Sequence, residues 1–299
     1  MDNSSYFVAN KALFGGYPTQ KEVEEYENNG VRYFINLTED GEKGIEPYTT
    51  KYVYIHYPIK DRKAPNDWKS FSEFIINICN IIKNLNGEKL FLSCKGGHGR
   101  SGIVVACLLC YMYDISPTES IEKTSKYHGM RKNMRDKWRK IGSPQTMFQK
   151  NFVSKFFNPL YIESDNNNFS YEFSNEFDLS VTSVDLVSFP IISAYHLKNT
   201  FKNDYIKSLE KTIEYSDIEN IDKEQTNKEL ENNKEIYMYK VLSNKFDQHP
   251  HIKQYLINTG LRPIIFYSDD LYLGTSLDGK GKNTLGVIIM KIRKNMYIS

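Results

Sequence analysis

The segment "KLFLSCKGGHGRSGIVVACLL" places reactive side chains between two apolar runs. Cys94 ends the first run, and Arg100 and Ser101 begin the second. The loop between them holds one lysine, one histidine and three glycines, namely Lys95, Gly96, Gly97, His98 and Gly99. The residue types restrict the chemistry to that of a thiol next to cationic groups.

A strand ending at Cys94, a glycine loop and a helix beginning near Arg100 predict an anion-binding site. The N–H groups of such a loop and the positive end of the helix converge on one point. This field favours a thiolate, so Cys94 is a candidate nucleophile. The planar fork of Arg100 can bind two oxygens of a tetrahedral phosphate, and Ser101 can hydrogen-bond the departing sulfur. The glycines allow the backbone to approach the phosphate closely.

The run from Cys94 to Gly102, "CKGGHGRSG", resembles the CxxGxxR-S/T phosphate loop of cysteine-dependent protein tyrosine and dual-specificity phosphatases. "LFGGYPT" and "RYFINLTEDGE" look like the opening strands of dual-specificity domains, so the resemblance covers about residues 5 to 158. Ser93 departs from the pattern, because the family usually has histidine there. The resemblance implies that Cys94 attacks phosphorus and passes through a phosphocysteine. The phosphate-binding residues would be Lys95, Gly96, Gly97, His98, Gly99 and Gly102.

Two further segments resemble parts of the same family. In "YIHYPIKDRKAPND", Asp61 matches the general acid that protonates the leaving oxygen, and Asp67 is the alternative. Either could instead be a solvated loop carboxylate. "GSPQTMFQKNFV" resembles the glutamine segment that positions the hydrolytic water. Gln145 and Gln149 are the candidates there, and exposed polar residues of a helix are the competing interpretation.

Short apolar runs alternate with longer periodic segments in the first half of the chain. We expect strands at "RYFINL", "YVYIHYP" and "KLFLSC", and helices at "WKSFSEFIINICNIIKNL" and "SGIVVACLLCYMY". This alternation predicts an α/β domain with a mainly parallel sheet flanked by helices. An Asn-rich linker follows, so we expect one domain over residues 1–160 and a second over 161–299.

Composition sets limits on partners and on compartment. The 299 residues carry a formal net charge of +2, which gives no general attraction to nucleic acid or membranes. No apolar run is long enough to cross a bilayer. Four cysteines, of which Cys107 and Cys110 lie in a predicted buried helix, indicate reduced thiols rather than a disulfide framework. We expect a cytoplasmic protein, with the nucleus as a further option, that needs no metal or cofactor.

The C-terminal region carries a second motif. "GKNTLG", with Met290 and Arg293 after it, resembles the closing "GxNxLGxxLMxxR" motif of the NADAR family, which is also called YbiA-like. "KFDQHPHIKQYLINTG" and "FSNEF" resemble other segments of that family, so the resemblance covers about residues 168 to 294. It implies an α+β domain and cleavage of N-glycosidic bonds in ADP-ribosylated guanine or in early riboflavin-pathway intermediates. By motif position, the pocket residues would be Asn175, Asp270 and Asn283.

The NADAR-like region departs from its family at one important segment. Where the family reads "PSVEHYYQAxKF", this chain has "PIISAYHLKNTF", so Ser193 replaces the acidic residue and Leu197 the glutamine. Glycosidic hydrolysis needs a carboxylate, and Asp270 or Glu176 would have to substitute for the missing one. We therefore expect a domain that binds a ribosyl or ADP-ribosyl ligand without cleaving it. His196 is expected to pack in the core.

The sequence predicts a phosphatase of phosphomonoesters, with a phosphorylated protein, a nucleotide or an RNA end as substrate. Lys95 and the basic stretch "MRKNMRDKWRK" suit a polyanion, although such a stretch is also typical of a solvated helix face. Two alternatives remain open. One is a phospho-ligand adaptor without turnover, and the other is an N-glycosidase with an accessory phosphatase domain.

Overall fold

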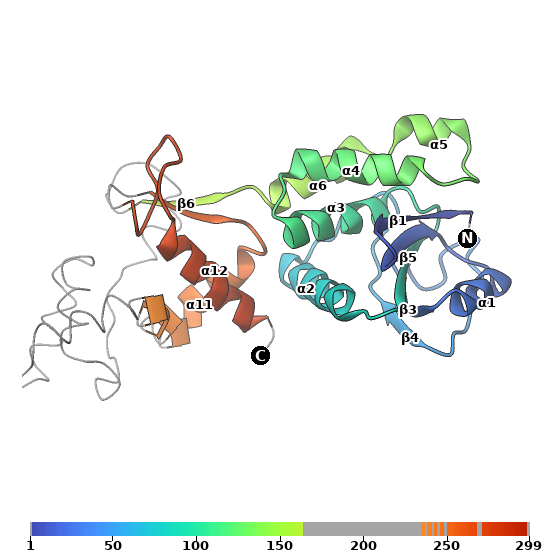
Figure 1. Ribbon diagram of the computed structural model, residues 1–299, viewed down its shortest axis with the longest axis horizontal. Helices are drawn as coiled ribbons and strands as arrows, with labels where there is room; N and C mark the ends of the chain where they lie inside the picture. Colours follow the sequence, from blue (N-terminus) through green and yellow to red (C-terminus); the bar gives the residue numbers. More distant parts are fainter. Residues whose placement is uncertain are drawn as a thin grey trace, which may run out of the picture. The chain divides into compact units, whose positions relative to one another are not determined.

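The computed structural model describes residues 2–163 and 235–297, apart from 237, 241, 244–245, 248–249 and 268–270 (Figure 1). The chain divides into two compact units, Met1–Asn158 and Pro159–Ser299. This division lies two residues before the boundary expected from the sequence. Several residues named above fall outside the described part, namely Asn175, Glu176, Ser193, His196, Leu197 and Asp270.

The first unit is built on a five-stranded sheet with the order β1-β2-β5-β3-β4. Strand β1 is antiparallel to β2, and all other neighbours are parallel. The α/β class and the mainly parallel sheet predicted from the sequence are thus confirmed. Strand β5 lies in the middle of the sheet, and its residues are almost all buried there. The strands are β1 (Ser4–Val8), β2 (Ala12–Gly16), β3 (Val31–Asn36), β4 (Val53–His56) and β5 (Lys89–Cys94).

Helices lie on both faces of this sheet. Helix α3 is buried from Arg100 to Cys110 and contacts β5, β2 and the helices α2, α4 and α6 (Figure 1). Helix α1 packs with Leu13, Phe34 and Phe91. Since strand side chains alternate between faces, α1 and α3 cover opposite sides. The helices are α1 (Gln20–Asn28), α2 (Trp68–Asn84), α3 (Arg100–Tyr113), α4 (Pro117–Gly129), α5 (Asp136–Ile141) and α6 (Met147–Phe156).

The cysteines of α3 belong to the packed interior. Cys107 and Cys110 are free and buried, and the Cys110 thiol donates to the Ser120 hydroxyl at 3.1 Å. Burial raises the pKa of both thiols, for Cys110 to about 11. Their CxxC spacing therefore marks a buried helix face and not a redox pair.

The second unit contains a parallel two-stranded sheet, in which Leu160 pairs with Ile264 and Glu163 with Tyr267. Phe246, Leu256 and Ile289 lie in the core that surrounds it. Among the helices in the described part of the chain, none has the length and apolar character that crossing a membrane needs. The labelled elements are β6 (Leu160–Glu163), α11 (Pro250–Asn258), β7 (Ile264–Tyr267) and α12 (Thr284–Met296).

Candidate active site

Cys94 lies at the carboxyl end of the central strand of the first unit, between the ends of β2 and β3. It pairs with Gly16 of β2 and is buried. The backbone on both sides of it is fixed, since Leu37 N–H donates to Ser93 O at 2.9 Å and Tyr17 N–H to Lys95 O at 3.2 Å. The Ser93 hydroxyl donates to Ile35 O at 3.2 Å. The sheet therefore holds the thiol in place from both flanks.

The loop after Cys94 turns tightly at Gly97, which has φ of 71° and donates its N–H to Cys94 O at 3.2 Å. A Cβ on Gly97 would overlap the backbone of Gly15. One on Gly99 would lie 2.6 Å from the Gln149 amide nitrogen. The structure thus supplies a packing reason for these glycines, beside the close approach to phosphate expected from the sequence.

Arg100 is a fully buried side chain with an ordered set of partners. Its Nη1 donates to Glu42 Oε2 at 2.6 Å and to Ile59 O at 3.0 Å, and its Nη2 donates to Glu42 Oε1 at 2.8 Å. The Nη1 group has no proton left, so the open edge of the guanidinium is the one formed by Nε and Nη2. Asp61 Oδ1 lies 3.3 Å from Nη2. This edge of Arg100 and the predicted acid therefore lie side by side.

Glu42 is a site residue that the sequence did not identify. Hydrogen bonds from Arg100 are the main cause that lowers its pKa, so the carboxylate stays charged while it orients the guanidinium. Glu42 lies in the segment "TEDGEKGIE", which contains four acidic side chains. No local pattern distinguishes the one that reaches Arg100, which is 58 residues away in the chain.

The two aspartates proposed as the acid have different surroundings. Asp61 is exposed beside Arg100, with 58% of its side chain accessible. Asp67 is the N-cap of α2, and its carboxylate accepts from Ser70 N at 3.1 Å. A carboxylate bound to a helix end has a structural role. Asp61 is therefore the acid that the geometry favours.

The glutamine segment reaches the loop through Gln149. Its side chain lies against Gly99 and is buried, and it completes a capping box with Thr146 at the start of α6. Gln145 is half-buried before this helix. The Ser101 hydroxyl is buried and has no hydrogen-bond partner among the described residues. It is therefore available to a sulfur or phosphoryl group.

The remaining loop side chains lead away from the thiol. Lys95 Nζ donates to Lys43 O. His98 stacks on Trp138 with ring centroids 4.7 Å apart, and its Nδ1 lies 2.7 Å from His128 Nε2. Burial is the main cause that lowers the pKa of His98 to about 4 and that of His128 to about 3, and both rings are neutral at pH 7.

In the second unit, the motif residues face β7. Asn283 has φ of 52°, accepts from Phe266 N at 2.8 Å and donates to Ile264 O at 2.8 Å. A Cβ on Gly286 would overlap Ile264 O. The motif thus joins helix α12 to strand β7. The amide of Asn283, predicted to line a pocket, has both of its polar atoms bound within the fold.

The later motif residues continue along the same helix face. Met290 Sδ accepts from Ile264 N at 3.3 Å. Arg293 is buried and donates to Thr259 Oγ1 and Arg262 O, both at 2.6 Å. Spacings of three, four and three residues from Asn283 to Arg293 explain why all of them lie on one face. These motif residues therefore fix the packing of α12.

Comparison with known proteins identifies both units. The model described as "Polymorphic toxin system, DSP-PTPase phosphatase" matches residues 11–113, and the NADAR domain model matches residues 156–297. "Putative tyrosine phosphatase 197R" of Invertebrate iridescent virus 6 is 33% identical over 292 residues, covering 96% of this chain and 89% of that protein. The chain belongs to this tyrosine phosphatase family. Its first unit is a phosphatase of the tyrosine and dual-specificity type, and its second is a NADAR domain.

Two other relatives cover parts of this phosphatase. "Putative tyrosine phosphatase 067L" of Invertebrate iridescent virus 3 is 40% identical over 167 residues, with 55% of this chain and 69% of that protein covered. The "N-glycosidase YbiA" of Shigella boydii is 36% identical over 72 residues, which are 24% of this chain and 45% of that protein. The two family resemblances read from the sequence motifs are confirmed.

Proposed function

We propose that the phosphatase unit hydrolyses phosphomonoesters through a phosphocysteine intermediate. In the first step, the Cys94 thiolate attacks phosphorus, an S–P bond forms and the bond from phosphorus to the leaving oxygen breaks. The Asp61 carboxylic acid gives its proton to that oxygen. The open edge of Arg100 and the loop amides hold the equatorial oxygens of the phosphoryl group.

In the second step, water attacks phosphorus and the S–P bond breaks. The Asp61 carboxylate takes one proton from the water, and inorganic phosphate leaves. The Gln149 amide, which lies against the loop, positions the water, and the Ser101 hydroxyl donates to the departing thiolate. No metal ion takes part in either step.

One observation carries this proposal. Both protons of Arg100 Nη1 are bound by Glu42 and Ile59 O, and the remaining guanidinium edge lies next to Asp61. A phosphate bound to that edge would have the thiol of Cys94 behind it and a carboxyl group at its exposed side. A site for binding alone has no need of a carboxylate beside the anion, because like charges repel.

The test is release of inorganic phosphate from a panel of substrates. The panel comprises a phosphotyrosine peptide, a phosphoserine/threonine peptide, phosphoinositides, triphosphorylated RNA and nucleoside monophosphates. Turnover by the wild type that is absent in Cys94→Ser supports the proposal and ranks the substrates. Tight binding of a panel member without any turnover would establish the phospho-ligand adaptor instead.

For the NADAR unit we propose binding of a ribosyl or ADP-ribosyl ligand without cleavage. The match over residues 156–297 and the relative named N-glycosidase support the ligand class. Ser193, at the position of the acidic residue of the family, argues against hydrolysis. Incubation with an ADP-ribosylated guanine oligonucleotide tests this, because retention of the intact ligand is expected. Release of ADP-ribose, with unmodified guanine left in the oligonucleotide, would show an N-glycosidase.

A further inference from the structure

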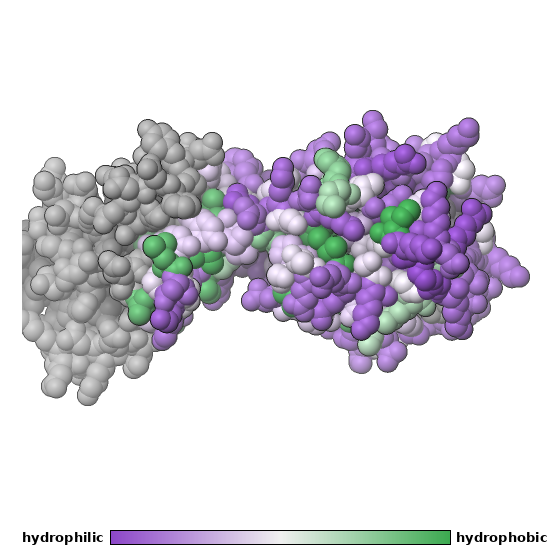
Figure 2. All heavy atoms as spheres, turned by 90° about the horizontal axis from the view of Figure 1, so that it is seen from above, coloured by the Kyte–Doolittle hydropathy of each residue, from purple (hydrophilic) through white to green (hydrophobic). Residues whose placement is uncertain are grey.

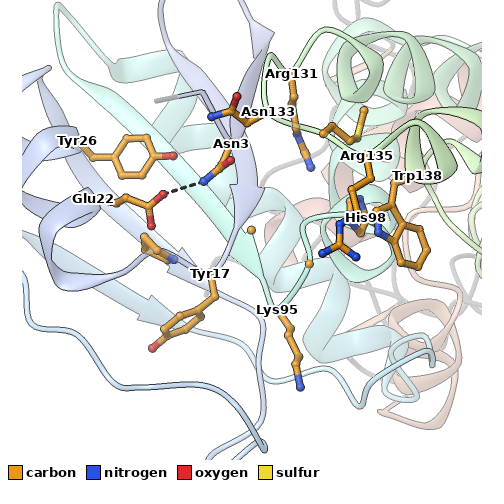
Figure 3. Close-up of a pocket in the computed structure, with 14 residues that line it drawn as sticks. Asn3, Tyr17, Glu22, Tyr26, Lys95, His98, Arg131, Asn133, Arg135 and Trp138 are labelled. Atoms are coloured by element: carbon orange, nitrogen blue, oxygen red, sulfur yellow. Dashed lines mark hydrogen bonds between the residues drawn. The ribbon is translucent and has the colours of Figure 1, made fainter.

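A cavity of about 300 Å³ lies directly beside the phosphate loop (Figure 3). Lys95, Gly96 and His98 form one wall of it, and Tyr17, after β2, another. The segment between α4 and α5 closes it on the side of Arg131. Figure 3 shows the guanidinium of Arg131 pointing into the space between these walls. The cavity and the phosphate loop therefore share a wall.

Arg131 is an unusual side chain for the interior. Only 2% of it is exposed, and its guanidinium lies over the ring of Phe14 at 4.4 Å from the centroid. Its Nε and Nη2 are buried without a hydrogen-bond partner. These two nitrogens form one edge of the fork, the edge that binds two oxygens of an anion side by side.

No carboxylate forms an ion pair with Arg131 in the part of the chain that the structure describes. Burial lowers the pKa of this guanidinium to about 10, which leaves it charged at pH 7. A buried guanidinium without a carboxylate partner is costly to keep charged. An arginine in this state is the expected signature of a site that lacks its anion.

The other charged groups that line the cavity are two cations and one carboxylate. Lys95 and Arg135 add positive charge to the lining. The carboxylate of Glu22 already accepts from Asn3 Nδ2 at 2.8 Å and from Thr19 N at 2.8 Å. The face of the phosphatase unit seen in Figure 2 is mostly hydrophilic, with small separate apolar patches. An anion is thus the ligand that this lining accommodates.

We propose that this cavity binds a second phosphoryl group of the substrate, next to the one that Cys94 attacks. The inference rests on the proposed phosphatase function and deepens it. It assigns the substrate to small molecules that carry two phosphoryl groups close together, either in one chain of phosphates or on one ring. The shared wall of Lys95, Gly96 and His98 sets the two phosphoryl groups side by side. A cavity of this size accommodates a compact ligand group rather than a folded partner.

The first test measures binding without turnover. Cys94→Ser is titrated by calorimetry with inorganic phosphate, pyrophosphate and tripolyphosphate. Hydrogen bonds to a charged group stabilise by about 1.5–3 kcal/mol, so we expect pyrophosphate or tripolyphosphate to bind about 10–100-fold more tightly than phosphate. Equal affinities for the three anions would overturn the second site.

The second test uses variants of adjacent residues. Arg131→Met should reduce the preference for pyrophosphate over phosphate to less than about threefold. Lys132→Met is the matched control, because it removes the same charge from a side chain that is 82% exposed. The preference of this variant for pyrophosphate over phosphate should stay within about twofold of that of the parent protein, since exposed charges are screened. A similar loss in both variants would show a general charge effect and contradict the proposal.

Arg131→Met could also act through the thiol, since the charge of Cys94 acts on Arg131. In that case, kcat/KM for a singly phosphorylated aryl substrate would fall as much as kcat/KM for a doubly phosphorylated one. Our proposal requires a fall at least tenfold larger for the doubly phosphorylated substrate. If Arg131→Met fails to fold, the anion series with Cys94→Ser alone still decides the matter.

Three substrate arms identify the source of the second group. They are a nucleoside triphosphate, an inositol bisphosphate and, as the contrary outcome, a doubly phosphorylated peptide. A preference for the peptide would overturn the assignment to small molecules. The anion titration is independent of catalysis, so a protein that binds pyrophosphate tightly yet turns over nothing would refute the proposed phosphatase reaction and leave the second site standing.

Discussion

Two motifs in this chain contain glycine, asparagine or arginine at fixed spacing, and their polar side chains differ in their hydrogen-bond partners. In "GKNTLGVIIMKIR" of the NADAR unit, Asn283 and Arg293 have bound their polar atoms to β7 and to the turn after α11. In "CKGGHGRSG" of the phosphatase unit, the Ser101 hydroxyl has no partner among the described residues, and one edge of Arg100 faces the exposed carboxylate of Asp61. The polar groups of the first motif are hydrogen-bonded within the fold, whereas the second motif has polar groups that can still bind a ligand.

The two motifs differ in whether their buried polar groups have hydrogen-bond partners. Buried polar groups are normally hydrogen-bonded, so a buried group that is left unpaired needs an explanation, and a ligand is the simplest one. By that criterion the NADAR motif has a structural role, whereas the unpaired polar groups of the phosphate loop and of Arg131 indicate ligand binding. Substitutions in both units test this distinction.

Removing the nucleophile should have the largest effect. Cys94→Ser is expected to lower kcat by about 10⁴-fold or more, because the hydroxyl is a far weaker nucleophile than a thiolate. Cys107→Ala is the control, since Cys107 is buried in α3 away from the loop. It should retain turnover while losing some stability. Equal losses in the two variants, measured as phosphate release, would contradict the assignment of Cys94.

The two aspartates should separate catalysis from folding. Asp61→Ala should lower kcat by about 10²–10⁴-fold through loss of the general acid. Asp67→Ala should lower the free energy of unfolding by about 1 kcal/mol, through loss of the α2 cap, with kcat nearly unchanged. Steady-state rates and urea unfolding measure the two effects. The reverse pattern would make Asp67 the acid.

Asn283→Ala should destabilise the NADAR unit without affecting phosphate release. It leaves two backbone groups of β7 unpaired and places alanine at positive φ, so a loss of about 2–4 kcal/mol is expected. Val287→Ala, on the exposed face of α12, should stay within about 0.5 kcal/mol. Hydrogen exchange of β7 reports this unit. Both tryptophans, Trp68 and Trp138, lie in the other unit and should show unchanged fluorescence.

The paired histidines should make the phosphatase unit sensitive to acid. The pKa values of His98 and His128 are about 4 and about 3 in the native state, below the ordinary value of 6.5. The unfolded chain therefore binds more protons, and stability falls as the pH drops from about 6.5 towards 4, by up to about 1.4 kcal/mol per pH unit for each histidine. His128→Gln should flatten this dependence in tryptophan-monitored unfolding. An unchanged slope would show that other groups control it.

Much of the phosphatase fold was predictable, because its elements have clear periodicity and clear ends. "KLFLSC" coincides with β5, and the helix expected from residue 68 to 85 is α2, Trp68–Asn84. Both are apolar enough to be buried by any fold of this class. The order of strand, loop and helix around Cys94 followed from the same signals.

The missing site residues depend on contacts between distant segments. Glu42 reaches Arg100 from another loop, and Arg131 is the buried member of the basic stretch from Met130 to Lys140, between exposed Met130 and Lys132. Residues between α4 and α5 have no helical period that would mark one of them as buried. Asp61 and Asp67 could be separated only when the cap of α2 was seen. The local sequence therefore does not predict that Glu42 and Arg131 belong to the site, or which of the two aspartates does.

The most direct test of the central claim is to trap the phosphocysteine. An acid quench of Asp61→Ala with an aryl phosphate, followed by mass spectrometry of its peptides, should find one phosphoryl group on the peptide that contains Cys94. The leaving group of an aryl phosphate departs with little need of an acid, so the intermediate should form and its hydrolysis should be slow. A phosphoryl group on another residue, or turnover with no adduct on Cys94, would contradict the account.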